Sequence, residues 1–454
     1  MNDRICAGLG ALFLGVGVLA FNASAAGFAL QEHSVAGLGN AFAGGAASAE
    51  DASTVFYNPA GMSLLEGSQL STGFHFVIPK AKFTNQGTTT LGVPTQGGNA
   101  ISKEEAILPN LFYVRPLNED LKFGIGVSAP FGLSTNYDKN WVGRYVARET
   151  SLETVIINPS IAYRVNDNVS IGGGLSYMKG DAVLSNAIDF GLVFLKQLQA
   201  GGIPANAQTM ALAGDIRANL GSTKYDGGLR LDGDGDGWGF NFGLVYEVTD
   251  SFRWGMHYRS GVSLNLSGNA DFEVGALSGV LGGAFQDQGG KVTIELPDTF
   301  ALSFYGDVNE KLSLMADVTH TTWSSFESLV IKFENLSPPD SVIPERWEDV
   351  NKYSVGATYK LSEKLTGRAG LALDESPVPS DAFRSPRIPD EDRFWISLGL
   401  SYAMNESLDL HVSYLNVQVT DPKIDNATHS AGQRLVGKID ASVNLISFGI
   451  TKRF

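Results

Sequence analysis

Few residues in this sequence have the types and spacing that catalysis or metal binding requires. The chain has six histidines, scattered without ligand spacing, and a single cysteine, Cys6. No G-x-S-x-G, P-loop or H-E-x-x-H motif is present. The acidic run 232–237 begins like a calcium loop, but its twelfth position is Gly243, where a bidentate glutamate is required. We therefore expect no resident metal, no cofactor and no enzymatic activity.

The residues that favour ligand binding are arginines and large apolar side chains. A ligand that carries a carboxylate needs a cation, and Arg393 and Arg259 are the candidates. Arg393 follows Asp390 closely, so an ordinary pair with neighbouring acids is an alternative interpretation that stays open. The candidates for contact with an apolar ligand are Phe190, Leu192, Phe194, Trp238 and Trp395.

Strands must position these side chains, because most of the chain after residue 68 alternates with period two. In the stretches 240–247, 252–259 and 394–402, one face is apolar and ends in aromatic residues. The other face carries charge and glycine instead of a second apolar core. This combination is typical of a transmembrane antiparallel β-barrel with lipid outside and a polar lumen. The expected fold class is all-β, and the expected location is the bacterial outer membrane.

The connections alternate between tight turns and long loops. Six short turns and seven long connections join about fourteen strands, an even number that leaves both ends on the periplasmic side. The longest connection, 182–235, is too long for a bare loop, and 190–195 and 205–220 are predicted to be helical. The last strand ends at Phe454, which is typical of the signal that barrel-assembly machinery reads during biogenesis.

The first part of the chain differs from the strands. Residues 1–25 have a positive start, an apolar run and an A-x-A site, as in a secretory signal peptide; an uncleaved anchor is the alternative. Residues 26–67 are rich in Gly, Ala and Ser and carry short helix-like pieces. We expect them to form a hatch inside a barrel of residues 68–454. The net charge of −15 argues against nucleic acid as a partner.

Two features predict how such a hatch and wall interact. Asn58, Pro59 and Ala60 lie at the centre of the hatch, where the Asn58 amide can bind the wall while Pro59 fixes the backbone; an ordinary turn is the alternative. Further on, the alternating strand 121–127 breaks off at proline and glycine, which are costly within a sheet. In a closed barrel such a break creates a hole, unless the strand merely ends there. The residues of the break are Ala129, Pro130, Phe131 and Gly132.

Motifs spread over the chain resemble the FadL family of long-chain fatty-acid transporters. Their order and spacing carry the resemblance, because no single motif is decisive. The motifs are Ala26-Gly27-Phe28-Ala29-Leu30, Gly37-Leu38-Gly39-Asn40-Ala41, Asn58-Pro59-Ala60, Trp238-Gly239-Phe240, Tyr258-Arg259-Ser260, Thr322-Trp323-Ser324, Ser376-Pro377-Val378-Pro379 and Ile388-Pro389-Asp390-Glu391-Asp392-Arg393-Phe394-Trp395.

The resemblance implies a mechanism. In that family, ligand binds at an external groove, passes to a lumenal pocket and leaves sideways into the membrane lipid, where a strand is kinked. It also implies that the mature N-terminus, Ala26, Gly27 and Phe28, occupies the pocket and moves when ligand binds. The expected function is therefore uptake of long-chain fatty acids and related hydrophobic molecules. Uptake of monoaromatic hydrocarbons is the first alternative, and an outer-membrane lipase is an alternative of another class.

Overall fold

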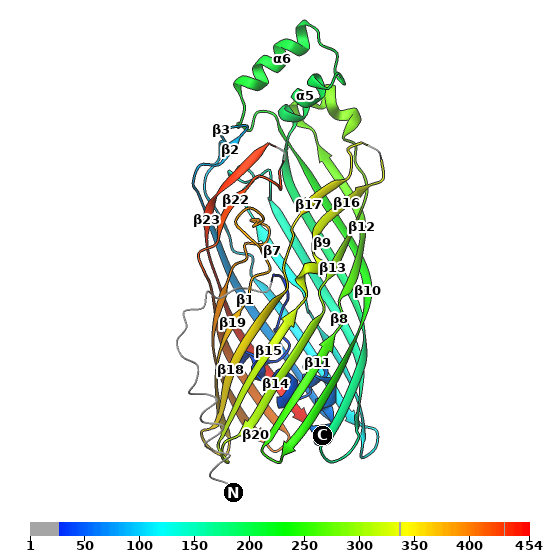
Figure 1. Ribbon diagram of the computed structural model, residues 1–454, viewed down its shortest axis with the longest axis vertical. Coiled ribbons are helices and arrows are strands. Elements are labelled where there is room, and N and C mark those ends of the chain that lie inside the picture. Colours follow the sequence, from blue (N-terminus) through cyan, green and yellow to red (C-terminus); the bar gives the residue numbers. More distant parts are fainter. Residues whose placement is uncertain (1–26, 336, 431) are drawn as a thin grey trace.

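The computed structural model describes residues 27–335, 337–430 and 432–454, and its fold is a tall, closed antiparallel barrel (Figure 1). Within those residues fourteen strands form the ring, and β1 pairs with β23 to close it. The predicted fold class is confirmed. The strands in order around the ring are β1 (Gln69–Asn85), β5 (Ala106–Pro116), β6 (Leu121–Ser128), β8 (Glu149–Arg164), β9 (Val169–Asp189), β10 (Asp226–Thr249), β11 (Phe252–Arg259), β14 (Thr299–Asp307), β15 (Leu312–Thr321), β18 (Val350–Lys360), β19 (Leu365–Asp374), β20 (Arg393–Asn405), β21 (Leu408–Val419) and β23 (Gln433–Arg453).

Further strands raise the wall at the loop end of the barrel. β9 and β10 stay paired up to Asp189 and Asp226, so much of the predicted loop 182–235 is strand. Its Gly/Asp-rich sequence has low β-propensity, but the ladders with β9 and with β12 override that preference. The additional strands are β2 (Thr89–Thr90), β3 (Val93–Pro94), β4 (Ala100–Ser102), β7 (Gly132–Asn136), β12 (Val262–Glu273), β13 (Gln288–Leu296), β16 (Ser328–Phe333), β17 (Ser341–Pro344) and β22 (Lys423–Asn426).

Helices cap this loop end (Figure 1). The Asp189 carboxylate accepts from the Leu192 backbone N–H at 2.9 Å and starts α5 (Phe190–Gln199). Asn206 and Thr209 form a capping box at the start of α6 (Ala207–Ala218). The short helices near the loop end are η2 (Gly275–Leu277), α7 (Ser278–Leu281), η3 (Gly282–Ala284) and η4 (Trp323–Ser325). Among the described residues, no helix is long and apolar enough to cross a membrane.

The two faces of the wall follow the alternation in the sequence. Phe240 and Phe242 are half exposed on the outer face, whereas Asn241 between them is buried against the lumen. The same contrast holds around the ring, where exposed aromatic and branched side chains form an apolar outer belt. Small and polar side chains face inward.

The hatch lies within the lower half of the barrel, drawn in dark blue in Figure 1. Its helices are α2 (Val35–Gly39), α3 (Gly45–Ser48), α4 (Thr54–Tyr57) and η1 (Pro59–Leu64). Glycines of the wall allow its backbone to approach closely. A Cβ at Gly255 would overlap the Ala46 carbonyl, and a Cβ at Gly370 would overlap the Asn40 backbone. The hatch is therefore seated through backbone contacts that leave no room for side chains.

These glycines provide a test of hatch seating. Gly255→Ala should displace the hatch, because the added methyl meets backbone that cannot rotate away. We expect more frequent channel openings of the purified protein in planar bilayers. The control is Gly306→Ala in β14, where the nearest atom, on Phe252, lies 3.5 Å from the new Cβ. Equal conductance of both variants and the wild type would contradict this account.

Candidate functional site

The wall is interrupted between β5 and β7. β6 ends at Ser128, and the chain rejoins the wall at Gly132 as β7, which pairs with β8. On the other side of the break, β6 pairs with β5 only from Leu111 onward. Residues 106–110 of β5 thus have β1 on one side and no ladder partner in β6 or β7. The break predicted around Pro130 is a real gap in the sheet.

The first described residues of the hatch fill this break from inside. The Leu30 backbone N–H donates to the Pro130 carbonyl at 2.9 Å, and the Gly132 N–H donates to the Phe28 carbonyl at 3.1 Å. Ala29 and Phe131 form an antiparallel bridge. The segment around Ala29 therefore acts as a short partner strand for the kink. In this structure the segment closes the gap.

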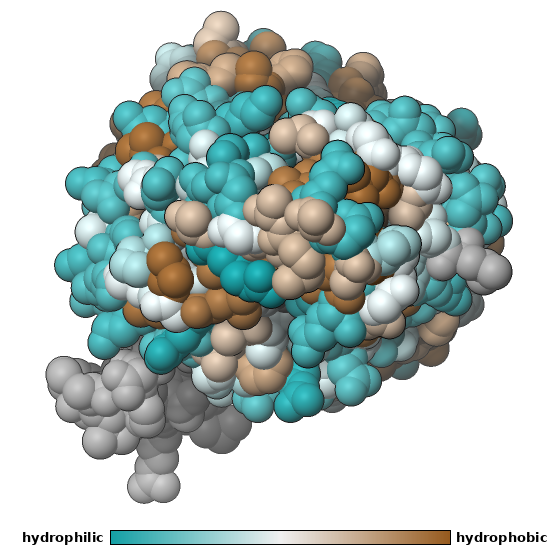
Figure 2. Space-filling model, turned by 90° about the horizontal axis from the view of Figure 1, so that it is seen from above, coloured by the Kyte–Doolittle hydropathy of each residue, from teal (hydrophilic) through white to brown (hydrophobic). Residues whose placement is uncertain are grey.

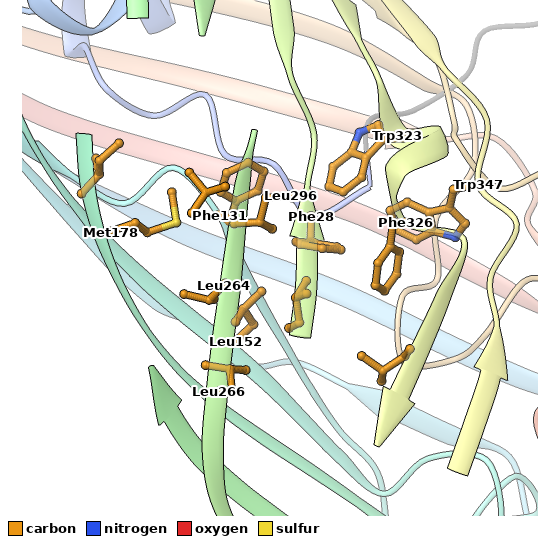
Figure 3. Packing of buried hydrophobic residues seen from close by; sticks show 14 of the residues in the cluster. Phe28, Phe131, Leu152, Met178, Leu264, Leu266, Leu296, Trp323, Phe326 and Trp347 are labelled. Atoms are coloured by element: carbon orange, nitrogen blue, oxygen red, sulfur yellow. The ribbon is translucent and has the colours of Figure 1, made fainter. Parts of the chain in front are cut away.

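An aromatic box surrounds the Phe28 ring (Figure 3). The Phe28 ring centroid lies 4.8 Å from that of Trp323, 5.7 Å from those of Phe326 and Trp347, and 6.1 Å from that of Phe131. Most of these pairs have edge-to-face geometry, which aromatic rings prefer. Phe28 is only 4% exposed. The box thus holds one apolar group tightly, and in this structure that group belongs to the hatch.

A cavity of about 80 Å³ lies between the box and the hatch. Phe131, Met178 and Val262 give it an apolar side that is continuous with the box. Arg259 and Lys352 give it two cations, and the buried Asp317 adds one acidic group that interacts with Lys352. Pockets that hold small ligands measure about 300 to 1,000 Å³. This cavity must therefore enlarge before it can hold a ligand of that size.

Arg259 is a buried cation without a carboxylate partner among the described residues. Its guanidinium donates to the Phe56 carbonyl at 3.0 Å and to Ser176 Oγ at 3.1 Å, and it lies 4.2 Å from the centroid of the Phe56 ring. Its Nε has no hydrogen-bond partner. A charge held by neutral groups keeps its capacity to bind an anion. The structure therefore places the predicted residue Arg259 beside the cavity with its charge uncompensated.

Arg393 is placed differently. Its guanidinium donates to Asp390 at 2.6 Å and to the Gly27 carbonyl at 2.8 Å, while the Gly27 N–H donates to Asp390 at 3.0 Å. Arg393 and Asp390 thus form a clamp on the backbone of Gly27. Ala26, also predicted to belong to the gate, lies outside the described residues, as does the predicted signal peptide 1–25.

Lys352 is a cation of the site that the sequence analysis did not single out. It is 5% exposed, its Nζ lies 3.3 Å from Gln31 Oε1, and it lies 5.2 Å from the Trp395 ring centroid. The sequence contains a signal for this position: Lys352 alternates with Tyr353, which faces outward, so Lys352 faces the lumen.

Asn58 joins the hatch to itself and to the wall. The Asn58 side-chain amide donates to the Ala46 carbonyl at 2.6 Å and to the Leu244 carbonyl at 3.0 Å. Its oxygen accepts from the Ala60 N–H at 3.0 Å, at the start of the helix that contains Pro59. Asn58 is fully buried. Three hydrogen bonds, two donated and one accepted, thus converge on the Asn58 side chain.

The remaining predicted contact residues lie elsewhere. Phe190, Leu192 and Phe194 are buried in α5; Phe190 and Phe194 belong to the apolar core of the loop cap. Trp238 is 67% exposed on the outer face of β10, beside Tyr177. Trp395 is buried against Phe42 of the hatch. The structure therefore brings only Trp395 of this group close to the hatch.

A buried acid and base lie in the loops above the aromatic box. Glu345 is 4% exposed, two residues before Trp347. Burial raises the pKa of Glu345 to about 8, an effect that the charge of Arg387 opposes. Arg387 is itself held by Thr150 Oγ1 at 2.9 Å. Burial therefore favours the neutral form of the Glu345 carboxyl, whereas Arg387 beside it keeps its charge at neutral pH.

The sequence model of the family described as outer membrane protein transport protein (OMPP1/FadL/TodX) matches residues 16–454. The chain belongs to this family. It is 32% identical to the long-chain fatty acid transport protein of Escherichia coli K12 over 421 residues, which cover 90% of the chain and 92% of the relative. It is 31% identical to outer membrane protein P1 of Haemophilus influenzae over 415 residues, covering 87% of the chain and 86% of the relative. This family member is an outer-membrane protein, as predicted.

Solved structures agree with the fold. A Pseudomonas aeruginosa FadL homologue matches this FadL/TodX family member with a TM-score of 0.85 and 27% identity, over 94% of the chain and 100% of the homologue. The Pseudomonas putida toluene transporter TodX matches with a TM-score of 0.67 and 20% identity, over 94% and 99%. The second likeness shows the shared fold alone.

The anchoring role of Asn58 can be tested in this FadL/TodX family member by an isosteric change. Asn58→Asp removes both donated hydrogen bonds and buries a charge, at a cost of about 1 to 3 kcal/mol or more. We expect a loosened hatch, measured as increased entry of a large hydrophilic antibiotic into cells. Asn309→Asp is the control, because the Asn309 oxygen only accepts bonds, from the Lys311 and Leu312 N–H groups. Identical antibiotic sensitivity of the two variants would show that Asn58 is no anchor.

Proposed function

We propose that this protein takes up long-chain fatty acids and related hydrophobic molecules across the outer membrane. One observation supports this above all: a cavity with two buried cations and an apolar side borders a break in the barrel wall. The curated relative from Escherichia coli is a long-chain fatty acid transport protein by name. An amphiphile with an anionic head and an apolar tail matches both parts of the cavity.

The entry route follows apolar side chains from the mouth. In the view of Figure 2, side chains fill the loop face, and apolar groups lie among hydrophilic ones. Below it, Leu184, Leu231 and Ile331 line an apolar groove on the inner face of the raised wall. Leu266 and Ile294 belong both to this groove and to the cluster around Phe28. A hydrophobic ligand can thus move from the groove to the box without crossing a polar surface.

Phe28 is the gate in this proposal. Its ring occupies the aromatic box, and the segment behind it fills the wall break, so one displacement would vacate the site and open the exit. A ligand tail that enters the box replaces the apolar contacts that the Phe28 ring loses. Displacement then costs little in buried apolar area. The bonds at Gly27 and Leu30 are the ones that have to break.

The exit is lateral in this proposal, through Ala129, Pro130, Phe131 and Gly132 into the surrounding lipid. The alternative path runs straight down, past the hatch into a vestibule of about 620 Å³. That vestibule is lined by charged groups such as Lys311, Lys364 and Asp409. An apolar tail would be exposed to water there, at about 0.8 kcal/mol per methylene. The wall break avoids that cost.

We also propose that Phe454, the last residue of the chain, marks the protein for the barrel-assembly machinery.

Uptake of labelled oleate by cells that lack their own fatty-acid transporter tests the main proposal. Expression of this protein should restore oleate uptake above the background of cells with an empty vector. Toluene uptake is measured in the same cells, because monoaromatic hydrocarbons are the alternative substrates. The aromatic box favours that alternative, since its rings surround a phenyl ring in this structure. Failure to transport either compound would refute the proposal.

The head-group role of Arg259 separates the two substrate classes. Arg259→Gln should weaken oleate binding by about tenfold or more, because a charge-assisted bond is lost, and leave toluene binding unchanged. The measurement is isothermal titration of the purified protein. Arg253→Gln is the matched control: Arg253 donates to the hatch carbonyls of Ala47 and Ser48 at 2.6 Å but does not line the cavity. If both variants lost oleate binding equally, hatch loosening would explain the effect instead.

The lateral exit predicts a position-dependent block. A cysteine at Ile107, which is 59% exposed and lies on the stretch of β5 that pairs only with β1, would carry a bulky maleimide beside the gap. We expect labelling to abolish oleate uptake. A cysteine at Val355 is the control, because it is 46% exposed and β18 is paired on both sides there. Unimpaired uptake with the adduct at position 107 would exclude an exit at this gap.

A further inference from the structure

We propose that the outer wall carries a binding site for the phosphate groups of an outer-leaflet lipid. The site is a basic strip, defined as Lys80 and Lys82 of β1, Lys423 of β22, and Arg434 and Lys438 of β23. β1, β23 and β22 are neighbours in the sheet, so these side chains lie on adjacent strands. This site is separate from the transport route and does not rest on the proposed function.

The basic strip faces away from the lumen. The residues that alternate with it, such as Phe83, Ile424 and Ile439, are buried in an apolar cluster inside the barrel. Lys82, Lys423 and Lys438 are all exposed. The strip is therefore available to molecules in the membrane and not to a ligand in the cavity.

The cations of the strip outnumber its acids. Lys80 pairs with Asp440 at 3.0 Å, and Arg434 pairs with Asp425 through two bonds of 2.6 and 2.7 Å. Lys82, Lys423 and Lys438 form no ion pair within the described residues.

Two of these lysines oppose each other. Lys423 stands directly opposite Lys438 in the ladder between β22 and β23. Like charges at directly opposite positions destabilise a sheet, unless a counter-ion lies between them. Lys291 and Lys332 oppose each other in the same way between β13 and β16, so such a pair alone does not define a site. The Lys423–Lys438 pair points to an anion because it lies among the three further cations of the strip.

The height of the strip matches lipid head groups. On the same face of β1, Phe74, Phe76 and Ile78 are exposed and belong to the apolar belt. Lys80 and Lys82 follow Ile78 by two and four residues, about 7 and 13 Å along the strand. The strand tilts, so both ammonium groups lie just beyond the hydrocarbon edge, on the side of the long loops. Phosphate groups of the outer leaflet are found at this level.

The wall around β9, β10 and β12 has more acids than cations on its outer face, where Lys179 and Arg230 are also exposed. Asp181 of β9, Asp234 and Asp236 of β10 and Asp271 of β12 lie on its outer face. The whole chain has a net charge of −15, so a patch with excess lysine is a local exception. Its field draws anions to this sector.

A membrane lipid fits the strip better than free phosphate does. The exposed Phe74 and Phe76 continue the strip into the apolar belt, and together they match a molecule with phosphate groups above acyl chains. In such a lipid, the contact of the acyl chains with the apolar belt and the pairing of phosphate with lysine both contribute to the binding free energy. Free phosphate gains only the contribution of the charge pairing. The lipid would sit beside β5 and therefore next to the wall break.

The test uses the purified full chain in mixed micelles with diphosphorylated lipid A, and native mass spectrometry counts the retained lipid. Replacing Lys82, Lys423 and Lys438 by Gln should weaken retention by about tenfold or more, since each lysine near an anionic surface contributes to binding. Arginine at the same three positions should keep retention. All three side chains are exposed, so we expect the variants to fold. Folding is checked by comparing the gel mobility of heated and unheated samples.

A matched control removes the same charge elsewhere. Lys139, Lys179 and Lys224 are exposed elsewhere on the protein, and no lysine stands opposite any of them in a strand ladder. Their replacement by Gln should leave retention at the wild-type level. Equal loss in the strip variant and the control would overturn the proposal. So would equal retention of lipid A without its phosphates. If inorganic phosphate displaced the lipid at equal concentration, the strip would be a site for free phosphate, and the assignment to a lipid would be wrong.

Discussion

Wall cations that bind backbone carbonyl groups of the hatch are the interaction on which the rest of this structure depends. Lys122 donates to the Leu65 carbonyl, Arg164 to that of Ser63, and Arg253 to those of Ala47 and Ser48. Arg259 and Arg393 hold the Phe56 and Gly27 carbonyls in the same way. Buried carbonyls need donors, and cationic donors give stronger bonds than neutral ones. The hatch is thus held along its length without needing acidic side chains of its own at these points.

This mode of attachment has a consequence for ligands. A carbonyl group accepts a hydrogen bond from a guanidinium group, but it carries no negative charge to neutralise the cation. Arg259 therefore keeps a positive field at the edge of the cavity while it also holds the hatch. An anionic head group that approaches Arg259 competes with the Phe56 carbonyl for the same cation. In the proposed mechanism, ligand binding and loosening of the hatch are therefore linked through Arg259.

The hatch and the wall complete each other at the break. Pro130 has no N–H, but its free carbonyl receives the Leu30 N–H, and Phe28 supplies an acceptor for Gly132. Without the hatch segment these backbone groups would lack partners in an apolar environment, which is costly. The gap is therefore stable only when it is filled by backbone, or when it opens to a ligand and solvent. This mutual satisfaction explains how a barrel can keep an interrupted strand and remain closed.

The sequence by itself determined the barrel, because period-two alternation is local and survives in any register that keeps one face toward lipid. It also predicted the break at Pro130 and the importance of Asn58, since proline and a buried amide have strong local consequences. It identified Arg259 as a lumenal cation but could not separate it from Arg393. Only the tertiary structure decided that Asp390 neutralises Arg393, that Phe28 fills a box whose residues lie about one hundred to three hundred positions away, and that Lys352 joins the site. Such pairings depend on which strands become neighbours and at what height, and alternation within one strand contains no information about either.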